Sequence, residues 1–221
     1  MSQSIDLEFG SSALRLSLPA NTDVLRLAAV PALPDAAGAV RAALASPLGA
    51  LPLVEIAANK VRSKGAESAV IVVSDKTRPV PYRGPEGILE PVIGMLRAAG
   101  VGRITILVAT GTHSAMDDAE LRRMLPDSVF HEGIEVINHD CRDAASLQCL
   151  GRTRRGTDIW LNRLYLDADL RILTGLVEPH FMAGVSGGPK TARVDGPERR
   201  AWTARNDARG RPVTGSLRWR A

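Results

Sequence analysis

The chain has 221 residues, of which 45% are hydrophobic and 4% aromatic, so it can bury one sizeable aliphatic core. No apolar run reaches the ~18 residues of a membrane span. Met1 to Gly10 lack the basic and apolar regions of a signal peptide. Cys141 and Cys149 lack CxxC spacing and are typical of free thiols. We therefore expect a cytoplasmic globular protein that contacts no membrane.

The net charge of +4 comes from the last residues of the chain. Residues 191–221 hold eight arginines against three acidic residues, which leaves 20 basic and 21 acidic residues in 1–190, a net charge of −1. A nearly neutral body argues against specific nucleic-acid binding, which needs a basic face on the folded part. Non-specific nucleic-acid binding by the tail stays a minor alternative. Residues 191–221 show no clear amphipathic period, and we expect them to be disordered.

Hydrophobic patterning predicts an α/β fold. Residues 4–8 and 13–17 alternate apolar and polar side chains, as in a short β-hairpin. Continuous apolar runs predict strands at 69–73, 103–109, 134–137, 159–166 and 170–176. The predicted helices cover residues 36–45, 53–63, 84–99 and 116–125. Asp35 is expected to cap the first helix and Gly65 to end the second. Strands alternating with helices indicate a mostly parallel, Rossmann-like sheet with helices on both faces.

Polar segments follow three of the predicted strands, at residues 74–79, 109–113 and 178–190. In parallel sheets, ligands bind at the carboxyl ends of the strands. Each segment alone is compatible with an ordinary loop. Together they bring an aspartate, an arginine, two histidines and a lysine to one edge of the sheet, so the sequence predicts a pocket there.

The side chains at this edge suit a small organic acid. Arg78 offers a planar fork for a carboxylate, although a surface ion pair is the simpler alternative. Asp75 could orient Arg78, bond a hydroxyl or cap a helix. His113 and His180 can exchange protons near neutral pH, and two opposed bases are what inversion of a stereocentre requires.

Other residues near the strand ends receive weaker interpretations. His131 and His139 are interpreted as structural, and residues 138–140 are expected to support the pocket from behind. The glycines at 184, 187 and 188 allow positive φ and close backbone approach, just before a lysine that could grip a phosphate or act as a nucleophile. A flexible loop with a solvated lysine is the alternative. A kinase-like phosphate loop is disfavoured because GxxxxGK[ST] spacing is missing.

The segments SDKTRP at 74–79, ATGTH at 109–113 and PHFMAGVSGGPK at 179–190 resemble the lactate racemase family, which uses a nickel-pincer nucleotide. The resemblance covers most of residues 5–190. It implies a two-domain α/β enzyme that racemises or epimerises small 2-hydroxy acids, with residues 1–190 as its N-terminal domain. It also implies a pyridinium-3-thioamide-5-thiocarboxylic acid mononucleotide that carries nickel, and proteins that synthesise this cofactor as partners.

The resemblance implies a role for each matched residue. Lys190 would form the thioamide that tethers the cofactor, and His113 and His180 would transfer protons on opposite faces of the substrate. Arg78 would hold the substrate carboxylate with support from Asp75, while hydride passes reversibly to the cofactor. The nucleotide phosphate is expected near backbone N–H groups of Thr110, Gly111, Thr112, Ser186, Gly187 or Gly188.

After Lys190 the chain departs from the family pattern. The family continues with a nickel-binding histidine, expected near Asn206, but no histidine follows His180. The composition of 191–221 resembles an out-of-frame reading of GC-rich coding sequence. We therefore expect a truncated or frameshifted chain that lacks the C-terminal domain and contributes no metal ligand, so nickel would be held weakly. Apolar surface left by that domain would favour self-association. The alternative function is an inactive remnant, or a domain that binds small acids without catalysis.

Overall fold

The computed structural model describes residues 2–10, 12–25, 31–65, 67–131, 133–154, 156, 158–180 and 184–187. The expectations for Gly188, Lys190 and residues 191–221 lie outside the described residues. The chain divides into two compact units, Met1–Pro34 and Asp35–Ala221, and each is described by itself. Across the described ranges, no helix has both the length and the apolar character that crossing a membrane requires.

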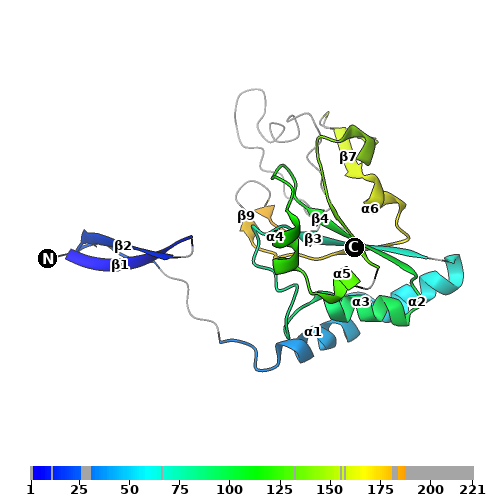
Figure 1. Ribbon diagram of the computed structural model, residues 1–221, viewed down its shortest axis with the longest axis horizontal. Helices are drawn as coiled ribbons and strands as arrows, with labels where there is room; N and C mark the ends of the chain where they lie inside the picture. Colours follow the sequence, from blue (N-terminus) through cyan, green and yellow to red (C-terminus); the bar gives the residue numbers. More distant parts are fainter. Residues whose placement is uncertain are drawn as a thin grey trace. The chain divides into compact units, whose positions relative to one another are not determined.

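The N-terminal unit is an antiparallel hairpin, as its alternating pattern predicts (Figure 1). Strand β1 (Ser2–Phe9) pairs with β2 (Ser12–Pro19), and Leu7 lies opposite Leu14 while Asp6 lies opposite Arg15. Because side chains alternate along each strand, the two leucines share one face and the charged pair shares the other. There Arg15 Nε donates to Asp6 Oδ1 at 2.8 Å.

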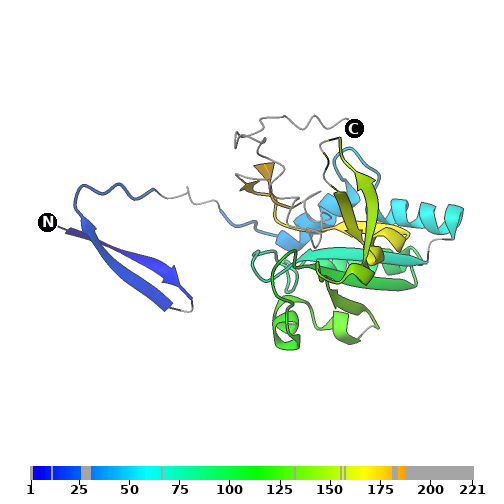
Figure 2. The ribbon, with the colours of Figure 1, turned by 90° about the horizontal axis from the view of Figure 1, so that it is seen from above.

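A four-stranded parallel sheet in the order β5-β4-β3-β8 forms the centre of the second unit (Figures 1 and 2). Its strands are β3 (Ser68–Ser74), β4 (Arg103–Ala109), β5 (Glu135–Asn138) and β8 (Leu170–Leu173). Strands β3 and β4 end together, with Ser74 opposite Ala109. Strand β8 ends three residues before the predicted 176, and Thr174, just beyond it, donates to Val72 O from both its N–H and its hydroxyl.

The first three helices follow the predicted pattern, with one late start. They are α1 (Ala36–Ala45), α2 (Leu53–Lys64) and α3 (Leu89–Ala98). Asp35 caps α1 by accepting from Gly38 N at 2.7 Å, and Gly65 ends α2 with a φ of 60°. The predicted start of α3 at Gly84 is wrong, because residues 84–87 form a turn in which Gly87 N donates to Gly84 O at 2.9 Å.

Two short helices, α4 (Asp118–Met124) and α5 (Ser128–His131), follow β4. Helix α4 lies inside the predicted range 116–125. Asp117 and Glu120 form a reciprocal capping box at its start, which satisfies two backbone N–H groups that would otherwise lack partners. The box fixes where the loop after β4 ends and the helix begins.

The region between β5 and β8 differs most from the prediction. The single strand expected at 159–166 is wrong: the structure has strand β7 (Asp158–Asn162) followed by helix α6 (Arg163–Asp167). Asn162 makes the switch, because its side-chain oxygen accepts from Leu164 N at 2.9 Å and caps the helix. Strand β6 (Leu147–Arg152), preceded by the 3-10 turn η1 (Ala144–Ser146), was not predicted and pairs antiparallel with β7.

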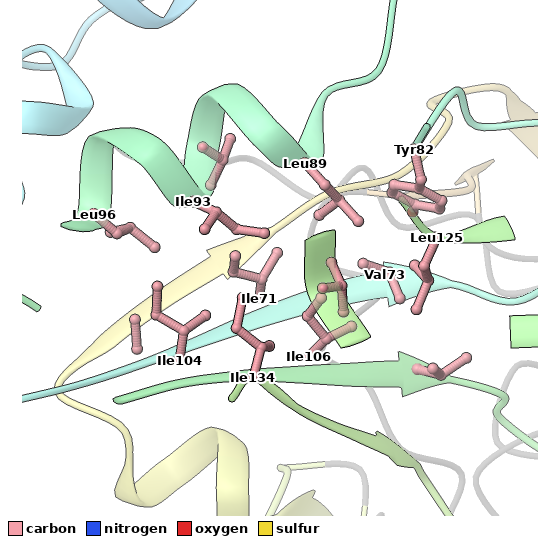
Figure 3. Close-up of a cluster of buried hydrophobic side chains, with 14 of the residues drawn as sticks. Ile71, Val73, Tyr82, Leu89, Ile93, Leu96, Ile104, Ile106, Leu125 and Ile134 are labelled. Carbon is pink, nitrogen blue, oxygen red and sulfur yellow. The ribbon is translucent and has the colours of Figure 1, made fainter. Parts of the chain in front are cut away.

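Hydrophobic cores lie on both faces of the sheet. On one face, Ile71, Val73, Ile104 and Ile106 pack with side chains of α3, as Figure 3 shows. On the other face, a smaller cluster joins the alternate residues of β3 and β4 to α6: Val70, Val72, Leu107, Ala168 and Tyr165. Helices therefore cover both faces, which confirms the predicted α/β class.

Candidate active site

The three polar segments emerge from neighbouring strands at one edge of the sheet. The strand order places β3 between β4 and β8, and all three run in parallel. Segment 74–79 therefore leaves the sheet beside segment 109–113, and the chain that leads to residues 178–187 leaves beside it on the other flank. We call these the first, second and third loops. Ligands of parallel sheets bind at this kind of edge.

The first and second loops meet in a short contact between Asp75 and His113. Asp75 Oδ2 lies 2.5 Å from His113 Nδ1. The Asp75 side chain is only 6% exposed, whereas the His113 side chain is 54% exposed. Thr77 engages the other oxygen of the carboxylate, since its backbone N and its hydroxyl donate to Asp75 Oδ1 at 3.0 and 2.5 Å. A fixed, buried carboxylate thus holds one nitrogen of an accessible imidazole.

These contacts keep Asp75 ionised. Burial alone would raise the pKa of this carboxyl, but the Thr77 and His113 hydrogen bonds and the attraction to His113 outweigh burial and lower the pKa below its ordinary value. An ionised carboxylate accepts hydrogen bonds and cannot donate one. His113 Nδ1 is therefore the donor of the contact, and in the neutral ring Nε2 is left as the acceptor.

Arg78 lies on the same loop as Asp75. Its backbone N donates to Asp75 O at 3.1 Å, which closes a turn, and its Nη1 donates to Thr77 O at 3.2 Å. The predicted carboxylate-binding arginine is thus carried by a turn that also fixes Asp75. The alternative interpretation of Arg78 was a surface ion pair. In the part of the chain that the structure describes, Arg78 makes no ion pair with a carboxylate.

The second loop starts with a buried threonine. Thr110 Oγ1 donates a short hydrogen bond to His139 O, and Thr110 O accepts from His113 N at 3.0 Å. Gly111 has a φ of 59°, a conformation that favours glycine, and its position leaves open space where a side chain would be. Thr112 is exposed. Of the three second-loop residues whose backbone N–H groups were predicted near a phosphate, Thr110 donates its own N–H to Val108 O at 3.0 Å.

The third loop is closed on itself by Ser186. Its hydroxyl donates to Leu176 O at 3.0 Å and accepts from Glu178 N at 3.1 Å, while its backbone N donates to Glu178 O at 2.9 Å. Gly187 has a φ of 65°, and a Cβ there would lie 2.5 Å from Leu176 O. Both residues are thus built into the loop, and Gly187 tolerates no larger side chain without rearrangement.

His180 belongs to strand β9 (Pro179–His180), which pairs antiparallel with β10 (Gly184–Val185). The side chain of His180 lies outside the described part of the structure, as do Gly188 and Lys190. The structure thus brings Asp75 and His113 together, and the second predicted proton-transfer residue and the predicted tether stay predictions.

The sequence profile of the lactate racemase N-terminal domain matches residues 9–194. The chain belongs to this family. Curated relatives named lactate racemase are 32% identical over 152 residues in Thermoanaerobacterium thermosaccharolyticum and 34% identical over 154 residues in Lactiplantibacillus plantarum. The solved structure of the lactate racemase apoprotein from Thermoanaerobacterium thermosaccharolyticum has 30% identity and a TM-score of 0.68, covering 86% of this chain and 42% of that chain. Each curated match covers 69% of this chain and 34% of the relative, so the chain spans about a third of their length.

The site also has supporting residues that the sequence patterns did not indicate. Tyr82 is fully buried, and its hydroxyl accepts from Ser74 N at 2.7 Å and donates to Thr174 Oγ1 at 3.2 Å, because Thr174 uses its own hydroxyl proton on Val72 O; these bonds tie the ends of β3 and β8 together. Lys76 pairs with Glu120 of α4. A buried tyrosine needs a partner for its hydroxyl, and this requirement is the feature of the sequence that could have pointed to Tyr82.

Proposed function

We propose that this chain is the proton-transferring, cofactor-tethering part of a racemase or epimerase of small 2-hydroxy acids. The observation that carries the proposal is the 2.5 Å contact between Asp75 and His113, which joins two of the three segments that resemble the lactate racemase family. A buried carboxylate that orients an exposed imidazole is the arrangement expected of a general base. The relatives named lactate racemase support the same reaction class.

In this proposal His113 moves the proton of the substrate hydroxyl. Asp75 holds Nδ1–H, so Nε2 of the neutral ring accepts the proton from the 2-hydroxyl group. The carboxylate then stabilises the imidazolium that forms. The same atom returns the proton when the substrate is regenerated. Arg78 binds the substrate carboxylate, and His180 serves the opposite face of the substrate by resemblance to the family.

The described donor groups fit an organic anion rather than a metal ion bound directly by the protein. Both oxygens of Asp75 and Nδ1 of His113 are already engaged. Within the described ranges, no three His, Cys, Asp or Glu side chains are grouped as metal ligands. These observations are compatible with a nickel-pincer nucleotide tethered by Lys190, with cofactor-synthesis proteins as partners. When bound, that cofactor would supply the acceptor for the hydride of the α-carbon.

A second candidate function is binding of small acids without catalysis. One observation favours it: no histidine follows His180 in the sequence, so the nickel-binding histidine expected near Asn206 is missing. In that case Arg78 would still recognise a carboxylate and Nε2 of His113 a hydroxyl, but nickel would be held weakly.

Co-expression of the full chain with nickel-pincer-synthesis proteins separates the two functions. Racemase function predicts a mass increment on Lys190 and interconversion of D- and L-lactate, followed by chiral chromatography. His113→Ala should abolish interconversion but keep the mass increment, whereas His131→Ala, at an exposed histidine of α5, should keep both. An unmodified Lys190 together with unchanged enantiomer ratios would overturn the proposed racemase.

A further inference from the structure

Asn138, the last residue of β5, makes a two-point contact with Met116, at the end of the segment that continues the second loop toward α4. Its Oδ1 accepts from Met116 N at 3.0 Å, and its Nδ2 donates to Met116 O at 2.9 Å. A single side chain thus satisfies both backbone groups of one residue, as a neighbouring strand would. The Met116 side chain is itself 4% exposed in the main core, so this end of the loop is fixed by packing and by hydrogen bonds.

The opposite end of the same segment is held by the residue that directly follows β5. Thr110 Oγ1 bonds His139 O, and His139 N donates to Val108 O at 3.0 Å. The segment from Thr110 to Met116 is therefore held at both of its ends. The contacts come from Asn138 and His139, two consecutive residues at the end of β5. His113 lies midway between Thr110 and Met116. Its side chain is 54% exposed, so packing alone cannot fix where its imidazole lies.

We propose that Asn138 is a positioning residue that sets the path of the second loop, so that His113 Nδ1 reaches the buried Asp75 carboxylate. This inference rests on the proposed function for its catalytic consequence. The amide is suited to the task because it offers a donor and an acceptor in one plane. An aspartate has the same size but no donor, and its second oxygen would face Met116 O. Alanine removes both bonds and leaves the Met116 backbone groups without these partners.

The test reads the His113 ring directly and needs neither cofactor nor substrate. In the full chain labelled with 15N-histidine, nitrogen chemical shifts report which ring nitrogen carries the proton. His113→Ala identifies the His113 signals, and Asp75→Asn shows the spectrum without the carboxylate. We expect the unaltered chain to carry the proton on Nδ1. Asn138→Ala and Asn138→Asp should each convert this to a mixture of tautomers, while the signals of His131, an exposed histidine of α5, should change little.

Asn59→Ala is the matched control, because Asn59 is on α2 and bonds Arg62 at 2.5 Å. It should leave the His113 signals unchanged. A folded Asn138→Ala or Asn138→Asp protein with the His113 signals of the unaltered chain would overturn the inference. If Asn138→Ala does not fold, the isosteric Asn138→Asp decides alone, and failure of both to fold would overturn it in favour of a purely structural role.

Turnover provides a second readout where the cofactor-loaded chain racemises lactate. A displaced base should lower kcat by roughly 10- to 100-fold with little change in KM, because misplacement of a reacting group mainly affects the transition state. The two failures are distinguishable. Absence of turnover in the unaltered chain contradicts the proposed function, whereas an unchanged His113 spectrum in the Asn138 variants contradicts this inference alone.

Discussion

The two oxygens of Asp75 accept hydrogen bonds from different residues. Replacing one oxygen by an NH2 group, as in asparagine, would therefore change the contact with only one of them. Oδ1 accepts from both the backbone N and the hydroxyl of Thr77, whereas Oδ2 accepts from His113. An asparagine at this position would keep its oxygen where the Thr77 donors need an acceptor. Its NH2 group would then face His113 Nδ1 and force that nitrogen to become the acceptor.

Asp75→Asn should therefore invert the His113 tautomer and remove the base at Nε2. We expect kcat of the cofactor-loaded chain to fall on the order of 10²- to 10⁴-fold, which is the usual contribution of general-base catalysis. Chiral chromatography of lactate measures this rate. Asp118→Asn, at an exposed carboxylate of α4 paired with Arg122, should keep the rate. Wild-type kcat in the Asp75→Asn protein would contradict the assigned roles.

The sequence predicted Asp75 and His113 separately but not the contact between them. They are 38 residues apart, and their meeting depends on β3 and β4 being neighbours that end at the same level. Local residue patterns contain no information on strand order. The pattern also left Asp75 with alternative roles, because an aspartate followed two residues later by threonine forms the same local turn with or without a function.

At the scale of elements, Tyr82 links the strands that carry the first and third loops. Its hydroxyl accepts from Ser74 N of β3 and donates to Thr174 Oγ1 just after β8. Tyr82→Phe removes this bridge and leaves the ring packed in the core. The free energy of unfolding should fall by about 1–2 kcal/mol, the usual cost when a buried hydrogen bond is lost.

Urea denaturation measures that loss, and amide hydrogen exchange locates it. The Ser74 amide should exchange faster in Tyr82→Phe, while amides in the middle of β3 should change less. Tyr165→Phe is the matched control, because Tyr165 is the other tyrosine of the chain and lies half-buried on α6. Unchanged stability and unchanged Ser74 exchange would mean that the bridge does not hold the strand ends.

Elements marked by a continuous apolar run or by a capping residue in a polar context were predicted well, whereas a boundary inside an apolar run was not. The buried β-branched run of β3 and the Asp35 cap of α1 gave clear signals. By contrast, residues 159–166 are apolar enough for one strand, and only the Asn162 cap divides them into β7 and α6. Strand β6 was not predicted because its register with β7 shifts between Cys149 and Gly151, which breaks the alternation of side chains.

At the scale of the whole molecule, the order of the strands determines which loops lie next to one another at the candidate site. Sequence predicted parallel strands but not the order β5-β4-β3-β8, which brings the three loops to adjacent positions. The same order brings the amino ends of β3 and β8 together, at the opposite end of the strands from the three loops. There Asp169 accepts from Ser68 Oγ at 2.7 Å and from the backbone N of Glu67 and Ser68 at 3.0 Å each.

An ionised aspartate therefore makes hydrogen bonds at each end of the parallel strands, Asp75 at the carboxyl ends and Asp169 at the amino ends. We expect this to make the fold sensitive to acid. The Ser68 hydroxyl and the two backbone N–H groups lower the pKa of Asp169 below its ordinary value. At Asp75, burial alone would raise the pKa, but the Thr77 and His113 contacts outweigh burial and lower it. A carboxyl with a lowered pKa stabilises the fold fully above the unfolded pKa of about 3.9, and this stabilisation is lost as the pH falls through the folded value.

We therefore expect the free energy of unfolding to be nearly level from about pH 7 to pH 5 with respect to these two groups, and to fall below about pH 4. Urea denaturation at a series of pH values measures it. Asp169→Asn should be less stable than the unaltered chain at neutral pH and should lose less stability on acidification, because one of the titrating groups is gone. Asp167→Asn, at an exposed aspartate that ends α6, should retain the original pH dependence. A steep acid loss that stays unchanged in Asp169→Asn would show that other carboxylates control the acid stability of the sheet.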